Sequence, residues 1–190
     1  MEKDRPNYLE FRRLIDFHLE QISSIKTVKN KLLPITGETN LIYKASRDGY
    51  TASSFHQKCD NQGPTISFIL SEPGQVFGGY TSISWTSPGA YIEDAAAFIF
   101  NLTKNSLHNQ YQNFEKGVIH NHTNLMIFGR GHDIFINNNC NYDNAYNTCD
   151  LGGTYMPPQG LKFRDSQAQE YLAGTYCFKV IEIEVYQVKS

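Results

Sequence analysis

Apolar residues near the start of the chain recur with the period of an α-helix. Six positions of one seam are spaced 3-4-3-4-3 along the sequence: Tyr8, Phe11, Ile15, His18, Ile22 and Ile25. Because residues three and four apart share one face of a helix, this spacing predicts an amphipathic helix within residues 1–33. His18 is the polar position in this otherwise apolar seam.

Two interpretations of the helix are open. We favour a helix whose apolar face packs on its own domain. The alternative is a short coiled coil or a docking helix. In that case a second chain would bind the face formed by Phe11, Ile15, His18, Ile22 and Ile25.

From residue 34 onwards, short apolar runs alternate with turn residues. Pro34 and the polar stretch after it mark the change, so we divide the chain into residues 1–33 and a domain of residues 34–190. A short helix is predicted at residues 53–59, where the hydroxyl of Thr51 can cap it. Strands are predicted at residues 41–44, 65–70, 76–82, 96–102, 118–120, 125–128, 133–136 and 176–188.

The last of these strands has the clearest alternation. Its two faces would carry Lys179, Ile181, Ile183 and Val185 on one side, and Phe178, Val180, Glu182, Glu184 and Tyr186 on the other. Two glutamates beside aromatic residues suggest a half-solvated face. Many short strands with few helices between them favour a mainly β fold, either a sandwich or a barrel, over a parallel α/β sheet.

Composition narrows the range of partners and compartments. The chain has 190 residues, of which 40% are hydrophobic and 13% aromatic, as is typical of a globular protein. A net charge of −2 argues against nucleic-acid binding by bulk electrostatics. The polar first residues and the lack of an apolar run of about 20 residues predict a cytoplasmic protein without signal peptide or membrane insertion.

The sequence contains no pattern typical of a catalytic or metal centre. His56, Cys59 and Asp60 lie close together, but we favour a structural role in which His56 and Asp60 fix the helix end and Cys59 fills the core. No Cys-x-x-Cys pair occurs. We therefore expect no catalytic residue, no cofactor and no metal. A redox role of Cys140 or Cys149 stays open.

Three loops contain candidates for a protein interface. Arg47 and Asp48 form either an ion pair that stabilises a turn or an exposed recognition loop. Trp85, the single tryptophan, is either a core residue or a binding anchor. His132 and Asp133 follow a glycine-rich turn; we favour a structural role for both, with an interface role as the alternative.

Eight segments of the chain, taken in order, resemble the TLDc domain family. One of them is Val76-Phe-Gly-Gly-Tyr-Thr-Ser82 with Trp85. The others are residues 43–49, 53–60, 63–65, 97–100, 128–134, 172–174 and 178–186. Together they cover about residues 40–188. A single segment is a weak signal, whereas eight in the family order are a specific one.

The resemblance implies a two-sheet antiparallel β-sandwich with short helices and a non-enzymatic role. Proteins similar to this one are linked to oxidative-stress resistance, bind the vacuolar-type proton-pumping ATPase (V-ATPase) and affect its assembly. We therefore expect a protein-binding module that engages this partner through loops at one end of the sandwich, around Arg47 and Asp48, Trp85, and Arg130 to Asp133. The alternative is a structural subunit of another large cytosolic or cytoskeletal assembly, docked through the N-terminal helix.

One position departs from the family pattern. Where the family usually has three glycines before His-Asp, this chain has Gly129-Arg130-Gly131. A left-handed backbone at Arg130 would cost about 1–2 kcal/mol. Either the turn is shifted in this chain, which we favour, or the Arg130 side chain points at another group.

Overall fold

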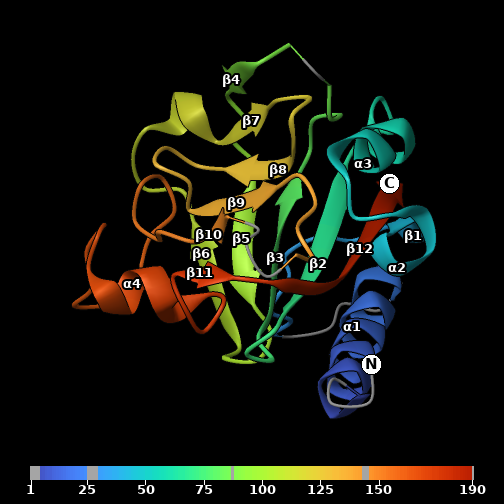
Figure 1. Ribbon diagram of the computed structural model, residues 1–190, viewed down its shortest axis with the longest axis horizontal. Helices are drawn as coiled ribbons and strands as arrows, with labels where there is room; N and C mark the ends of the chain where they lie inside the picture. The colour runs from blue at the N-terminus through green and yellow to red at the C-terminus, as the bar shows by residue number, and fades with distance from the viewer. Residues whose placement is uncertain (1–4, 25–29, 87, 143–145, 190) are drawn as a thin grey trace.

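The chain folds into two antiparallel sheets that pack face to face. The structure, a computed structural model, describes residues 5–24, 30–86, 88–142 and 146–189. Within them each sheet has six strands, and short helices lie at the edges (Figure 1). This confirms the predicted mainly β fold, a two-sheet antiparallel sandwich preceded by an N-terminal helix. Ile25 lies outside the described residues, so the structure does not place this member of the predicted docking face.

The first sheet has the strand order β1-β12-β2-β3-β5-β6. Its strands are β1 (Glu38–Lys44), β2 (Thr65–Ser71), β3 (Val76–Thr81), β5 (Phe98–Asn101), β6 (Ser106–Asn109) and β12 (Val180–Lys189). The second sheet has the order β11-β10-β9-β8-β7-β4. Its strands are β4 (Ala90–Ile92), β7 (Val118–His120), β8 (Asn124–Phe128), β9 (Ile134–Asn137), β10 (Asn147–Thr148) and β11 (Cys177–Phe178).

Helices connect and flank the strands. They are α1 (Arg5–Ser23), α2 (Ala45–Asp48), α3 (Ala52–Cys59), the 3-10 helix η1 (Phe114–Lys116) and α4 (Ser166–Tyr171). The hydroxyl of Thr51 accepts a hydrogen bond from the N–H of Ser54 at 3.1 Å, which confirms the predicted cap of α3. None of the described helices combines the length and the apolar character that crossing a membrane requires.

The space between the sheets is filled by apolar side chains from both of them. Phe77 and Ile99 of the first sheet and Phe128 and Ile134 of the second are fully buried there. Successive residues of a strand point to opposite faces, so the first sheet also presents Ile66, Phe68 and Leu70 of β2 on its outer side. The apolar side chains of this outer face require a further layer that shields them from water.

Helix α1 packs on the outer face of the first sheet and forms this layer. It lies on the first sheet against β1 and β2 (Figure 1). Phe11, Ile15 and Ile22 are at most 1% exposed, and His18 is 5% exposed. This confirms the favoured interpretation, a helix packed on its own domain. The face proposed for docking, Phe11, Ile15, His18 and Ile22, is occupied by that sheet, which corrects its placement as a free surface. The division of the chain at residue 34 stays a prediction.

A cluster of charges ties α1 to the sheet. Glu184 of β12 is 1% exposed and forms an ion pair with Arg12 of α1. It also accepts hydrogen bonds from Lys44 Nζ at 2.9 Å and from the hydroxyl of Tyr186 at 2.7 Å. Burial acts to raise the pKa of Glu184, but the hydrogen bonds from Tyr186 and Lys44 and the charge of Arg12 outweigh it and lower the pKa. Glu184 is therefore held as a buried carboxylate, not as part of a half-solvated face.

Strand β12 also differs from simple alternation. Its pairing with β2 shifts register between Val180 and Glu182, which marks a β-bulge. Val180 therefore joins Ile183 and Val185 in the core between the sheets, while Ile181 packs on the outer face. The predicted faces are right from Ile183 onwards and wrong before the bulge, because one extra residue reverses the alternation.

Replacing Ile15 with alanine tests how much α1 contributes to the domain. Ile15 is 0% exposed, so I15A should lower the free energy of unfolding by about 2–4 kcal/mol through lost burial and a cavity. Urea unfolding measures the change. L9A is the matched control, because Leu9 of the same helix is 60% exposed; it should stay within about 0.5 kcal/mol of the parent. Equal effects of both variants would contradict the packing of α1 described above.

His18 makes the fold sensitive to acid. Burial lowers the pKa of this imidazole, so between the folded pKa and the unfolded value of about 6.5 the unfolded chain binds more protons. The contribution of neutral His18 to the free energy of unfolding is fully present above this pH range. It is lost as pH falls through it, with a slope of at most about 1.4 kcal/mol per pH unit.

Leucine at position 18 should therefore flatten the pH dependence of unfolding between pH 7 and 5. Urea titrations at several pH values measure the slope. Burial shifts the pKa of His108, His120 and His132 in the same direction, so part of the slope should remain in H18L. H122L, at an exposed histidine, should keep the full slope. Identical slopes for the parent and H18L would rule out this role of His18.

Candidate functional site

Arg47 and Asp48 lie in the short helix α2. The Arg47 Nη2 is 2.7 Å from Asp48 Oδ2, and the Asp48 carboxylate also accepts the N–H of Lys44 at 2.9 Å. Gly49 follows with φ +107°, a conformation that glycine allows. These contacts match the turn-stabilising ion pair that the sequence predicts. The Arg47 side chain is nevertheless half exposed.

Trp85 is a core residue. It is 0% exposed, and its ring meets those of Phe55 and Phe128 edge to face, each at 5.7 Å between centroids. Its Nε1 donates to the hydroxyl of Thr65 at 3.0 Å, so its single polar atom is satisfied. The placement of Trp85 among the interface candidates is therefore corrected: no partner reaches it in this fold.

Asp133 is buried and organises the neighbouring loop. Its carboxylate accepts the backbone N–H groups of Gly152 at 2.7 Å, Gly153 at 3.0 Å, Thr154 at 2.8 Å and Tyr155 at 3.4 Å. Burial raises the pKa of Asp133 to about 7, and the four N–H groups act in the opposite direction. With no exposed surface, Asp133 is not an interface residue, which corrects that assignment.

The glycine-rich turn before Asp133 explains Arg130. Positive φ values fall on Gly129 (+76°), Gly131 (+74°) and His132 (+71°), whereas the backbone of Arg130 is not left-handed. Arg130 thus carries none of the strain that the family pattern suggests. The half-buried ring of His132 stacks on Phe135 at 4.7 Å, and burial lowers the pKa of this histidine. Arg130 alone of the predicted residues in this turn has an exposed side chain.

The predicted interface loops do not gather at one end of the sandwich. Helix α2, which carries Arg47 and Asp48, lies on the right of Figure 1 beside β1. The turn between β8 and β9, which carries Arg130, lies on the left. The exposed charges of Arg47 and Arg130 are therefore separate surface features, which corrects the prediction of one shared interface.

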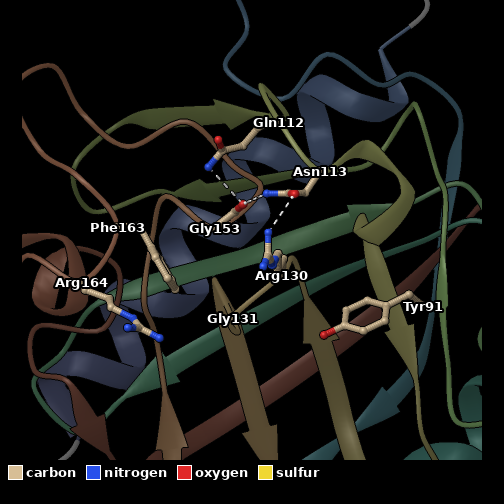
Figure 2. Close-up of a pocket in the computed structure, with 8 residues that line it drawn as sticks. All are labelled: Tyr91, Gln112, Asn113, Arg130, Gly131, Gly153, Phe163 and Arg164. Atoms are coloured by element: carbon tan, nitrogen blue, oxygen red, sulfur yellow. Dashed lines mark hydrogen bonds between the residues drawn. The ribbon is translucent and has the colours of Figure 1, made fainter.

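Arg130 instead lines a pocket that the sequence does not predict. The pocket has a volume of about 490 Å³ and is shown in Figure 2. Its walls come from several distant segments: Tyr91, Gln112, Asn113, Arg130, Gly131, Gly153, Phe163 and Arg164. The hydroxyl of Tyr91 and the guanidinium of Arg164 point inward from opposite sides. We take this as the candidate functional site.

Hydrogen bonds fix one wall of the pocket. Asn113 donates to the carbonyl of Gly153 at 2.8 Å and accepts from Arg130 Nη1 at 3.2 Å. Gln112 Nε2 donates to the carbonyls of Gly152 at 2.9 Å and Gly153 at 3.2 Å. Because Asp133 holds the N–H groups of the same two glycines, this wall is attached to the buried carboxylate through the backbone.

Phe163 and Arg164 form the opposite wall. The phenyl ring of Phe163 packs so tightly on Gly131 that a side chain at position 131 would collide with it. Arg164 has a left-handed backbone, with φ +73°, and its N–H donates to Asp150 Oδ1 at 2.9 Å. Its guanidinium carbon lies 5.3 Å from the centre of the Phe163 ring. The fold thus keeps Arg164 in a conformation that arginine rarely adopts.

Little in the sequence points to this pocket. Its walls are far apart in the chain, and Tyr91, Gln112 and Asn113 occur in no recognisable motif. The one usable signal is the pair Phe163-Arg164, an aromatic and a basic residue in a polar stretch without predicted structure.

The thiols and the helix-end histidine have structural surroundings. Cys59, Cys140 and Cys149 are 0% exposed, and burial raises the pKa of all three. The exposure that a peroxide-sensing Cys140 or Cys149 requires is therefore missing. His56 Nδ1 lies 2.7 Å from Asp60 Oδ1 and its Nε2 lies 2.9 Å from the carbonyl of Asn124, so it joins α3 to β8 as the structural interpretation predicts.

Metal-ligating side chains do not cluster in the described part of the chain. No group of three or more His, Cys, Asp or Glu residues there is arranged to hold an ion.

The chain matches a known protein family. The sequence profile described as TLDc domain matches residues 16–189, and this confirms the resemblance drawn from the motifs. The match begins inside α1 and ends at the last described residue of β12. No curated protein matches the chain.

Removing the Asp133 carboxylate should loosen the pocket. D133A leaves the four N–H groups without their acceptor and should cost about 2–4 kcal/mol in the free energy of unfolding. D133N retains one carbonyl oxygen and should cost less. Hydrogen exchange at Gly152 and Gly153 should accelerate in both variants before global unfolding.

The matched control is D165A, at an exposed carboxylate that accepts one N–H, from Lys162. Unchanged exchange at Gly152 and Gly153 in D133A would show that Asp133 does not organise this loop.

Proposed function

Since the chain belongs to the TLDc domain family, we propose that it is a non-enzymatic protein-binding module whose partner is the vacuolar-type proton-pumping ATPase. It would bind subunits of the pump in the cytoplasm and change their assembly state, and through this support resistance to oxidative stress. The observation that carries the proposal is the family match over residues 16–189.

The surroundings of the reactive side chains support the non-enzymatic part. The thiol of Cys59 is fully buried, and burial raises its pKa, which disfavours the thiolate that a nucleophile needs. Both nitrogens of the neighbouring His56 lie within hydrogen-bond distance of other groups, the Asp60 carboxylate and backbone carbonyls. Among the described residues, neither lines the pocket of Arg130 or the hollows around Met156, Phe98 and Leu107.

The exposed surface supports binding. Aromatic and apolar side chains remain solvent-accessible around the second sheet and its loops: Tyr91 is 45% exposed, Tyr111 39%, Phe114 51% and Met156 51%. Aromatic and methionine side chains are enriched in protein interfaces. Tyr91 belongs to the pocket of Arg130, and Tyr111 and Met156 line the adjoining hollow beside Phe163.

Affinity capture of the tagged chain from native lysate tests the partner. Pump subunits should be enriched, as identified by mass spectrometry, and the purified chain should bind the isolated pump and alter its assembly or ATPase rate. The tag alone is the control. Enrichment of cytoskeletal or other scaffold proteins without pump subunits would favour the alternative, a structural subunit of another assembly.

A second assay tests the non-enzymatic part. Purified chain should consume no peroxide and hydrolyse no ester or peptide substrate above the buffer rate. The double variant H56A/C59A should behave identically. An activity present in the parent and absent from this variant would overturn the proposal.

A further inference from the structure

We propose that the pocket between Arg130 and Arg164 binds carboxylate side chains of an acidic segment on the partner protein. The inference rests on the proposed function, because it assumes that the ligand is a protein, and it adds the chemistry by which that ligand is recognised. It assigns the two arginines as the anchoring cations and the aromatic walls as supporting contacts.

The two guanidinium groups differ from those of three other arginines of this chain. Arg12, Arg13 and Arg47 each form an ion pair with a carboxylate of the same chain. Arg130 and Arg164 have no such ion pair within 4.0 Å among the described residues. Two cations without a carboxylate partner therefore line one pocket.

Nearby carboxylates do not neutralise this pocket. Asp133 and Asp150 are buried and accept backbone N–H groups of the pocket walls. Asp165 accepts the N–H of Lys162, and Glu115 lies 3.8 Å from Lys116 Nζ. None of the four lines the pocket. The lining therefore has cations but no anion, and charge complementarity favours an anionic ligand.

The geometry suits carboxylates. A guanidinium presents paired N–H donors in a fixed plane that matches the two oxygens of a carboxylate. The Tyr91 hydroxyl points into the same space (Figure 2) and can donate to a second oxygen. The rings of Tyr91 and Phe163 give the methylene groups of a glutamate an apolar surface to contact.

The walls of the pocket are held in place before any ligand arrives. Asn113 accepts a hydrogen bond from Arg130, and Phe163 is pressed against Gly131. Arg164 is fixed at φ +73° by its bond to Asp150 and by its contact with Phe163. Less conformational freedom is then lost on binding, which favours affinity.

Net charge favours a protein over a polyanion. The chain as a whole carries −2, which disfavours binding of nucleic acid or an anionic membrane by bulk electrostatics. A segment with a few glutamates or aspartates brings a small charge that two arginines can match. We therefore commit to an acidic protein segment.

A peptide titration tests the inference. Chain labelled with ¹⁵N is titrated at low salt with a glutamate-rich octapeptide, and with the same peptide carrying glutamine in place of glutamate. The glutamate peptide should shift the amide signals of Gly131 and Gly153, and the glutamine peptide should not. The variant R130A/R164G should bind the glutamate peptide roughly tenfold more weakly or worse, since it loses both charge-assisted contacts.

Matched variants separate charge from folding. Glycine at position 164 removes the guanidinium and relieves the left-handed strain, so R164G should unfold no more easily than the parent. R130K/R164K keeps both charges and should show an intermediate loss because lysine lacks the planar fork. R13A/R47A removes two exposed arginines elsewhere and should bind within about twofold of the parent.

Several outcomes would overturn the inference. One is that both peptides shift the same signals; another is that R130A/R164G binds as well as the parent. A third is that inorganic phosphate or vesicles with anionic phospholipid shift Gly131 and Gly153 while the glutamate peptide does not.

Capture of the pump distinguishes this inference from the proposed function. If the parent captures pump subunits and R130A/R164G captures them equally, the pocket is not the contact and the proposed function stands. If the parent captures no pump subunits but the glutamate peptide binds at the pocket, the acidic ligand stands and the named partner is wrong.

Discussion

The central constraint on this molecule is that its first sheet is apolar on both faces. Strands β2 and β3 are buried along their whole length, so neither face tolerates water. The second sheet covers one face. The other is covered by α1, whose described seam residues Phe11, Ile15 and Ile22 are buried there together with Leu33. The helix therefore packs on the sandwich as a third layer, and the side chains by which it packs are not exposed.

The buried charges at this contact give the helix its position. Apolar packing alone is weakly directional, whereas Glu184 has partners on the helix and on the sheet, Arg12 and Lys44. The hydroxyl of Tyr8, one turn before Arg12, accepts a hydrogen bond from Lys44 at 2.7 Å. Sliding the helix by a turn would separate Arg12 from Glu184 and leave a buried carboxylate short of a partner. The cluster thus selects one register of α1 on the sheet.

The sequence predicts the strands that consist of apolar runs. It does not predict the strands whose residues are polar or partly exposed. Strands β2, β3, β7 and β8 lie where their apolar runs predict. Strands β4 and β6 are short and partly exposed, and β10 consists of two polar residues, so alternation does not reveal them. The β-bulge after Val180 reverses which residues of β12 face the core, and no local sequence pattern predicts this reversal. The sequence does not predict the pocket either, because Tyr91, Asn113 and Arg164 are far apart in the chain and come together only in the folded structure.

The close packing that requires glycine in the turn at residues 129–132 leaves the side chain of Arg130 exposed. The turn at residues 129–132 lies close to the loop at residues 152–155, whose N–H groups the Asp133 carboxylate accepts. A side chain on Gly153 would therefore collide with the carbonyl of Arg130. The left-handed positions fall on Gly129 and Gly131, and the backbone of Arg130 between them is not left-handed, while its exposed side chain lines the pocket. An arginine there costs the backbone little. An arginine in this glycine-rich turn thus places a cation beside the loop that Asp133 holds in position. Arg130 has an amide partner, Asn113, but no carboxylate partner among the described residues, so its charge stays available for recognition.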